Sequence, residues 1–211
     1  ILFILLGFPV IVAFILFIIN SGAYVVPQSS FESGQRGFTP QDCLGDPPPK
    51  PIATNVKFSS DGKYAFPVAP FEVPGYSCYH WDGNKATDIF SPQERPPLVA
   101  YEKGKIVNVT LNDSVGGKYI ILQGTTSGRY YYHAHLCHVF VKAGDVVDVG
   151  EVIGTMDESG NGRVQHLHYA INEPPFSDTF IGGHGNVCPQ EDFENKFGFG
   201  VCNRSNYCVS P

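Results

Sequence analysis

Closely spaced histidines are the first sign of chemistry in this chain. The stretch VQHLHYAINE, residues 164–173, places His166 and His168 two positions apart among residues typical of a β-strand. Successive side chains of a strand point to opposite faces, so we expect both imidazoles on one face. Imidazole is the commonest metal ligand and titrates near neutral pH. For this motif taken alone, two solvated histidines on a surface strand are an equally good interpretation.

A second segment offers another pair of imidazoles. In YYHAHLCH, residues 131–138, two-residue alternation predicts one strand face that carries His133, His135 and Cys137. His133 is expected to line a cleft there. For Cys137, which this geometry also brings near a metal, a disulfide or a buried thiol is the preferred role.

The segment YHWDGNKATDIFSP, residues 79–92, adds an imidazole and a carboxylate, His80 and Asp88. A catalytic zinc site needs three protein ligands and one open position for water, and a mixed set of histidine and aspartate meets that need. The residues alone therefore predict a zinc site made of His80, Asp88 and one of the later histidines. Zinc would lower the pKa of its bound water to about 7 and polarise a scissile carbonyl.

Four pieces of this chain occur in the order typical of one enzyme family. They are His80, then DIFSPQERPPLVAYEKGKIVNV, then YYHAHL, then VKAGDVVDVGEVIGTMDESGNGRVQHLHYAI. In this order they resemble the lysostaphin-type zinc endopeptidases, which cut peptide bonds in bacterial peptidoglycan, and the resemblance covers residues 64–174. Carried over by position, it implies that the zinc ligands are His80, Asp88 and His168. It implies His135 and His166 as the catalytic pair that does not bind the metal.

The chain departs from the family pattern at two points. The family usually spaces its first ligands as HxxxD, whereas His80 and Asp88 are eight apart with Asp82 between them. Asp88 is favoured over Asp82 because the following IFSP matches the strand after the family's ligand. The family's tyrosine two positions before its first catalytic histidine is replaced by His133, which leaves open whether Tyr132 or Tyr131 takes over any contact that the tyrosine makes.

Short β-branched and aromatic runs, separated by glycine-rich turns, predict an all-β fold. Strands at intervals of about ten residues indicate an antiparallel sandwich or barrel. The family resemblance implies an antiparallel β-sandwich of the barrel-sandwich-like type. The only helix expected is a short one at PQEDFENKF. The predicted organisation is a transmembrane anchor or signal segment at 1–20, a Pro/Ser/Gly-rich linker at 21–60, a zinc peptidase domain at 61–175 and a Cys-rich extension at 176–211.

The N-terminal nineteen residues carry no charge and are long enough to cross a bilayer as a helix. This predicts an extracytoplasmic domain in the cell envelope, tethered to the cytoplasmic membrane or released by cleavage. Six cysteines suit such a compartment, where disulfides persist, but their pairing cannot be chosen from sequence. A net charge of −6 argues against a nucleic-acid partner.

Taken together, these features predict a zinc endopeptidase that hydrolyses peptide cross-links of peptidoglycan. Metal-activated water would attack the peptide bond, with His135 and His166 as acid and base.

Two alternative functions come from other classes of protein. A copper protein could use HAHLCH with HLH, although it would lack a well-placed axial methionine. A non-catalytic relative could bind cell wall or activate another hydrolase, although such relatives typically lose ligands. Oligomeric state stays open.

Overall fold

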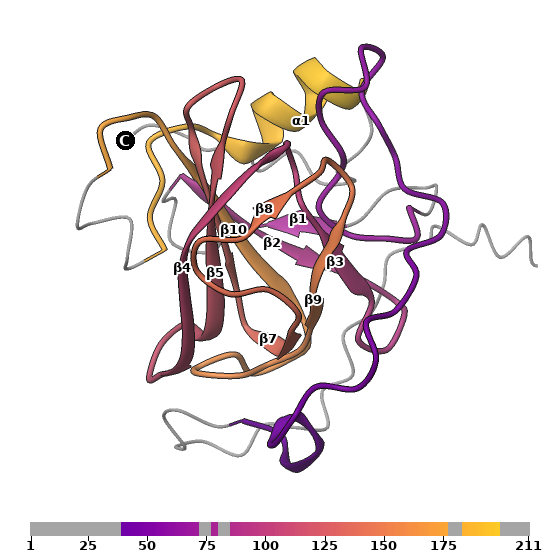
Figure 1. Cartoon of the computed structure of the whole chain (residues 1–211), viewed down its shortest axis with the longest axis vertical. Coiled ribbons are helices and arrows are strands. Elements are labelled where there is room, and N and C mark those ends of the chain that lie inside the picture. The colour runs from indigo at the N-terminus through magenta and orange to yellow at the C-terminus, as the bar shows by residue number, and fades with distance from the viewer. Residues whose placement is uncertain (1–38, 72–76, 80–84, 177–182, 199–211) are drawn as a thin grey trace, which may run out of the picture.

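Two antiparallel sheets form the domain in the computed structural model, which describes residues 39–71, 77–79, 85–176 and 183–198. In the described residues the large sheet has the order β1-β2-β10-β6-β5-β4-β8, and the small sheet has the order β3-β9-β7 (Figure 1). The strands of the large sheet are β1 (Ser77–Tyr79), β2 (Ala86–Phe90), β4 (Gly104–Asp113), β5 (Gly117–Gly124), β6 (Tyr130–Ala134), β8 (Val146–Val147) and β10 (Leu167–Asn172). Those of the small sheet are β3 (Pro97–Val99), β7 (Leu136–Val139) and β9 (Val152–Met156). The predicted all-β antiparallel fold is confirmed.

The main core lies between the two sheets. Its large-sheet members include Ile120, Leu122 and Tyr131, and its small-sheet members include Leu98 and Ile153, all fully buried. Burying an aliphatic side chain of this size stabilises the fold by about 1.5–3 kcal/mol. Because alternate residues of a strand point to opposite faces, the same strands also present a second, outward face.

A smaller apolar cluster covers that outward face. It consists of Ala86, Tyr119, Ile121, Tyr132, Ala134 and Ala170. These residues come from β2, β5, β6 and β10, so they form a continuous floor across the middle of the large sheet.

The predicted short helix is α1 (Pro189–Phe197). Proline at its first position suits a helix start, and the helix ends before Gly198, which has a φ of 92°. Its Phe193 is fully buried in the main core, against the rings of Phe66 and Tyr169. Helix α1 therefore contributes to the core of the domain.

The N-terminal part of the described chain is covalently linked to the domain by a disulfide. It begins with a short 3-10 helix, η2 (Gln41–Cys43), and runs along one side of the molecule (Figure 1). Cys43 forms a disulfide with Cys137 of β7, which confirms the role preferred for Cys137. The thiolate that a copper site would require from Cys137 is therefore absent.

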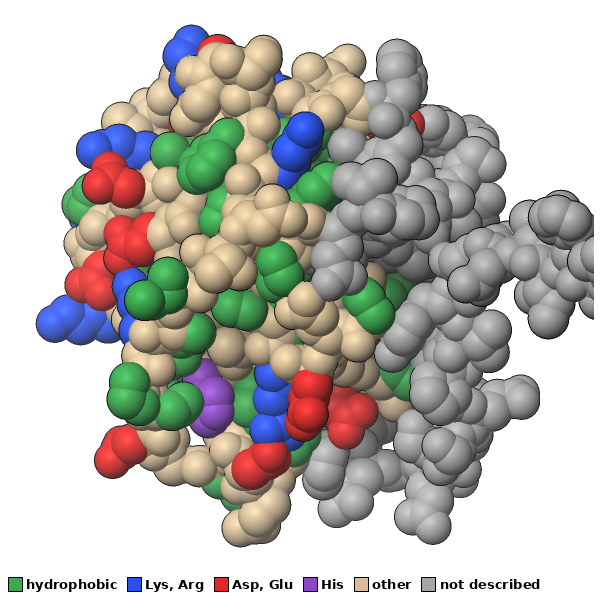
Figure 2. All heavy atoms as spheres, turned by 90° about the vertical axis from the view of Figure 1, so that its right-hand side faces the viewer, with side chains coloured by type: hydrophobic (Ala, Val, Ile, Leu, Met, Phe, Trp, Pro, Cys, Tyr) green, Lys and Arg blue, Asp and Glu red, His purple; other side chains and the backbone are tan. Residues whose placement is uncertain are grey.

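The predicted membrane segment, residues 1–20, lies outside the described residues. Within the part of the chain that the structure describes, no helix has the length and apolar character needed to cross a membrane. On the face shown in Figure 2, acidic and basic side chains of the described residues are intermingled.

Candidate active site

Asp88 and His168 are brought together by strand register. β10 pairs with β2 so that these two residues are direct partners, with the Nδ1 atom of His168 2.9 Å from Oδ1 of Asp88. His166 lies just before β10, and its Nε2 atom is 3.8 Å from the same oxygen. The intervening Leu167 is fully buried on the core side. The prediction that His166 and His168 share one face is confirmed.

His135 joins this group by a reversal of the backbone. β6 ends at Ala134, and His135 has a φ of 62°, in the left-handed region that residues other than glycine rarely adopt. Its ring centroid lies 4.5 Å from that of His166 and 5.9 Å from that of His168. The backbone N–H of His135 donates to the carbonyl of Gly116, and its carbonyl accepts from Asp157. Contacts from two distant segments thus hold this conformation.

The predicted common face of His133 and His135 is wrong. His133 points into the main core, where it is fully buried with its ring 5.0 Å from Tyr169. Strand alternation holds only while the backbone stays extended, and the left-handed residue at 135 turns the second imidazole to the outward face. His133 is a core residue, so its predicted place in a cleft is also wrong.

Each of the three clustered histidines is oriented by a backbone carbonyl. Nδ1 of His135 lies 2.6 Å from the carbonyl oxygen of Ser159, and Nδ1 of His166 lies 2.7 Å from that of Val164. A carbonyl can only accept, so these nitrogens carry the hydrogen and Nε2 keeps its lone pair. His168 has the opposite arrangement, because its Nε2 donates to the carbonyl of Gly183 at 2.9 Å. Its Nδ1 lone pair therefore faces Asp88.

This donor set fits a divalent metal. A carboxylate oxygen and an imidazole lone pair that approach to 2.9 Å repel each other unless a proton or a shared cation lies with them. A ligating histidine typically donates its other ring N–H to a carbonyl or carboxylate, as His168 does. Asp88 and His168 could therefore hold zinc. The third predicted ligand, His80, and the alternative aspartate, Asp82, lie outside the described residues.

Burial keeps the two other imidazoles neutral. His135 and His166 are 6% and 8% exposed, and desolvation lowers the pKa of both rings. Phe90 stacks on His166 with the ring centroids 5.5 Å apart. A neutral imidazole with a free Nε2 is suited to accept a proton.

Of the two tyrosines left open by the sequence, Tyr132 faces the site. Its ring centroid is 6.0 Å from that of His168. Tyr131 instead points into the main core, and its hydroxyl donates to the buried Glu102 at 2.7 Å. The three orienting carbonyls could not have been found from the sequence, because every residue has one.

His133 gives the domain a specific sensitivity to acid. Neither of its ring nitrogens has a well-formed hydrogen bond, and burial lowers its pKa from about 6.5 to about 3. The unfolded chain takes up this proton below about pH 6.5 and the folded chain does not, so stability falls as the pH drops from 6.5 toward 3. Between pH 7.5 and 5, we expect the wild type to lose about 2 kcal/mol more unfolding free energy than His133→Phe. Urea unfolding at both pH values measures this, and equal losses would contradict it.

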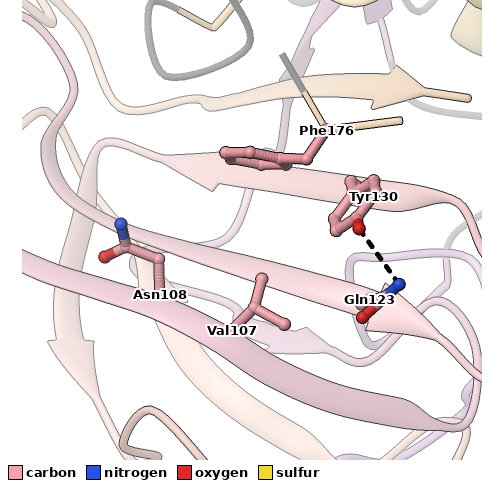
Figure 3. Close-up of a pocket in the computed structure, with 5 residues that line it drawn as sticks. All are labelled: Val107, Asn108, Gln123, Tyr130 and Phe176. Carbon is pink, nitrogen blue, oxygen red and sulfur yellow. Dashed lines mark hydrogen bonds between the residues drawn. The ribbon is translucent and has the colours of Figure 1, made fainter. Parts of the chain in front are cut away.

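A shallow pocket opens on the same outward face, away from the histidines. It has a volume of about 310 Å³ and is lined by Val107, Asn108, Gln123, Tyr130 and Phe176 (Figure 3). The Gln123 amide donates to the Tyr130 hydroxyl at 3.1 Å, and the Tyr130 and Phe176 rings meet edge to face. The lining is aromatic and amide in character, without a charged side chain.

Comparison with known proteins identifies the central part of the chain. Residues 82–179 match the model of peptidase family M23, and lysostaphin of Staphylococcus simulans is 31% identical over 83 residues. Residues 82–179 form a lysostaphin-type M23 peptidase domain. The aligned region is 39% of this chain and 17% of that lysostaphin, so the M23 domain corresponds to only a small part of the relative's length.

Solved structures similar to the M23 domain include two of lysostaphin from Staphylococcus simulans. Its catalytic domain is 29% identical with a TM-score of 0.43, over 50% of this chain and 81% of that domain. The larger lysostaphin structure is 25% identical with a TM-score of 0.46, over 54% of this chain and 49% of that one. Asp88, His135, His166 and His168 all fall within the M23 domain, and His80 precedes the matched residues.

Proposed function

We propose that this protein is a zinc-dependent endopeptidase that hydrolyses peptide cross-links of bacterial peptidoglycan. The observation that carries the proposal is the convergence of His135, His166 and His168 around Asp88, with one nitrogen of each ring committed to a backbone carbonyl. The match to peptidase family M23 supports peptide hydrolysis, and the similarity to lysostaphin supports a cell-wall substrate.

The side chains divide into a binding set and a proton-transfer set. Asp88 and His168 would hold zinc together with His80. When bound, zinc supplies Lewis acidity toward the scissile carbonyl and acidifies the attacking water. Nε2 of His166, which lies close to Asp88, accepts the proton of that water.

Nε2 of His135 completes the proton-transfer set. In the neutral ring the hydrogen is on Nδ1, so Nε2 donates a hydrogen bond to the oxygen that becomes negative only when His135 is protonated. The proton that His166 takes from the water passes to the leaving amine. The two rings lie 4.5 Å apart between their centroids, so both can reach one peptide bond. The deep burial of the pair limits competing hydrogen bonds from bulk water.

The pocket beside Tyr130 and Gln123 supports an extended, uncharged substrate. It lies on the same sheet face as His168, because Val107 and Tyr130 pack against the cluster that contains Ala134, the strand partner of His168. Asparagine and glutamine amides can pair with the amides of a peptide, and the aromatic rings can cover its apolar parts. A peptide cleaved at the histidines can therefore continue across the floor of the sheet toward the pocket.

The disulfide supports an extracytoplasmic location for this activity. Bonds such as Cys43–Cys137 persist mainly in oxidising compartments, where peptidoglycan is also found. Anchoring in the cytoplasmic membrane by residues 1–20 stays a prediction from the sequence.

Digestion of defined muropeptides, analysed by mass spectrometry, tests the proposed function. We expect the full chain to release peptide fragments, the release to stop after treatment with a chelator, and stoichiometric zinc to restore it. Metal analysis should find zinc, because a copper site would need the Cys137 sulfur that the disulfide occupies. Binding to peptidoglycan with no change in fragment masses would instead identify a non-catalytic cell-wall protein.

A further inference from the structure

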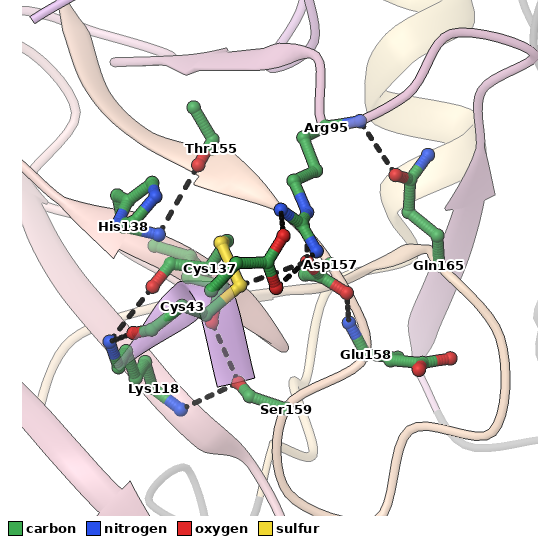
Figure 4. Close-up of a disulfide and its surroundings, with 12 residues drawn as sticks. Cys43, Arg95, Lys118, Cys137, His138, Thr155, Asp157, Glu158, Ser159 and Gln165 are labelled. Carbon is green, nitrogen blue, oxygen red and sulfur yellow. Dashed lines mark hydrogen bonds and ion pairs between the residues drawn. A yellow bond between two sulfur atoms is a disulfide. The ribbon is translucent and has the colours of Figure 1, made fainter. Parts of the chain in front are cut away.

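A group of charged and covalently linked residues lies next to the segment that contacts His135 and His166. Cys43 and Cys137 are joined by a disulfide, and Asp157 and Arg95 pack beside them (Figure 4). Potential ligand atoms of Cys43, Cys137 and Asp157 lie within 4.8 Å of one another. Because the two sulfurs are bonded to each other, this group is not a metal site, and its role must be sought in what it contacts.

The backbone of Asp157 connects the two proposed catalytic histidines. Its N–H donates to the carbonyl of His135 at 2.8 Å, and its carbonyl accepts from the N–H of His166 at 3.1 Å. The same segment supplies the Ser159 carbonyl that orients the His135 ring. A shift of residues 157–159 would therefore move both imidazoles.

Arg95 forms an ion pair with Asp157. Asp157 is 4% exposed, and its carboxylate pairs with Nε of Arg95. Burial raises the pKa of this carboxyl and the Arg95 charge opposes that effect, so removal of Arg95 would leave a buried carboxylate without its charged partner. The backbone N–H of Arg95 also donates to the side chain of Gln165, the residue before His166, at 2.6 Å.

Arg95 is itself bound by a residue from the N-terminal part of the described chain. The Arg95 guanidinium forms a two-pronged ion pair with the exposed carboxylate of Asp42, and the neighbouring Cys43 is bonded to Cys137, two residues after His135. Asp42 and Cys43 precede the matched M23 domain at 82–179. We call residues 39–57, which lie against the domain, the N-terminal strap.

We propose that the strap positions the catalytic histidines through the chain Asp42–Arg95–Asp157, with the Cys43–Cys137 disulfide as its anchor. The inference rests on the proposed function, because it assigns catalytic roles to His135 and His166. Arg95 and Asp157 are then positioning residues, and Asp42 is a third that lies outside the family domain. Misplacement of catalytic groups by about 1 Å can cost on the order of 100-fold in rate.

Steady-state kinetics of the full chain test the proposal. We expect Asp42→Ala to lower kcat about threefold to tenfold and Arg95→Ala by about tenfold or more, with KM and zinc content little changed. Arg95→Lys keeps the charge but not the two-pronged geometry, so it should restore part of the loss. The matched control is Lys50→Ala, which removes another ion pair of the strap, the exposed contact with Glu151 at 2.8 Å. This variant should keep the wild-type kcat.

Amide hydrogen exchange gives a measurement that does not depend on activity. The N–H groups of Asp157 and His166 should exchange about tenfold faster in Asp42→Ala and Arg95→Ala, and at the wild-type rate in Lys50→Ala. If the wild type cleaves no peptide, the proposed function fails, yet faster exchange would still show that the strap orders these segments. Unchanged exchange and kcat in a folded Asp42→Ala variant would overturn the proposal, even if Arg95→Ala does not fold.

Discussion

Replacement of His166 by alanine is expected to lower kcat by about 100-fold to 10,000-fold while zinc stays bound. Nε2 of His166 carries a lone pair 3.8 Å from Oδ1 of Asp88, so its loss removes the base and leaves the predicted ligands in place. Peptide hydrolysis and zinc stoichiometry, measured on the same preparation, check this expectation.

His168→Ala is the informative contrast. Its Nδ1 faces Asp88 at 2.9 Å, so the variant should lose both activity and zinc. His184→Ala, an exposed histidine outside the cluster, is the control and should retain both. If His166→Ala released zinc and His168→Ala retained it, the assigned roles of the two residues would be reversed.

Phe193→Ala is expected to cost about 3–5 kcal/mol of unfolding free energy, although Phe193 lies beyond the matched M23 domain. Its ring is fully buried and stacks on Tyr169, at a centroid distance of 5.5 Å, and contacts Tyr101 and Phe66. Alanine would leave a cavity in the main core. Urea unfolding of the full chain measures the loss.

Two comparisons make this result specific. Asn195→Ala changes an exposed residue of the same helix and should alter stability by less than about 0.5 kcal/mol. A similarly small loss for Phe193→Ala would show that α1 is not part of the cooperative core.

Phe193→Ala is also a control for the proposal about the N-terminal strap, because it destabilises the domain without contacting residues 157–159. We expect the kcat of this variant at 25 °C to stay near the wild-type value.

The sequence by itself determined the local features of this protein. Runs such as KIVNVTL and GKYIILQ predict β4 and β5, because β-branched and aromatic residues between glycine turns favour strands. Two-residue alternation correctly placed His166 and His168 on one face, since the strand there stays extended. The order of four sequence pieces also carried the family resemblance, which the M23 match confirms.

Only the tertiary structure decided how these pieces meet. The register of β2 with β10 puts Asp88 opposite His168. Backbone hydrogen bonds with Gly116 and Asp157 hold His135 in the left-handed conformation, which places it on the opposite face from His133. The disulfide partner of Cys137 and the packing of α1 also depend on residues far apart in the chain. Periodicity reports the conformation of a few neighbouring residues, whereas these features depend on the free energy of contacts across more than 15 positions, which no local pattern contains.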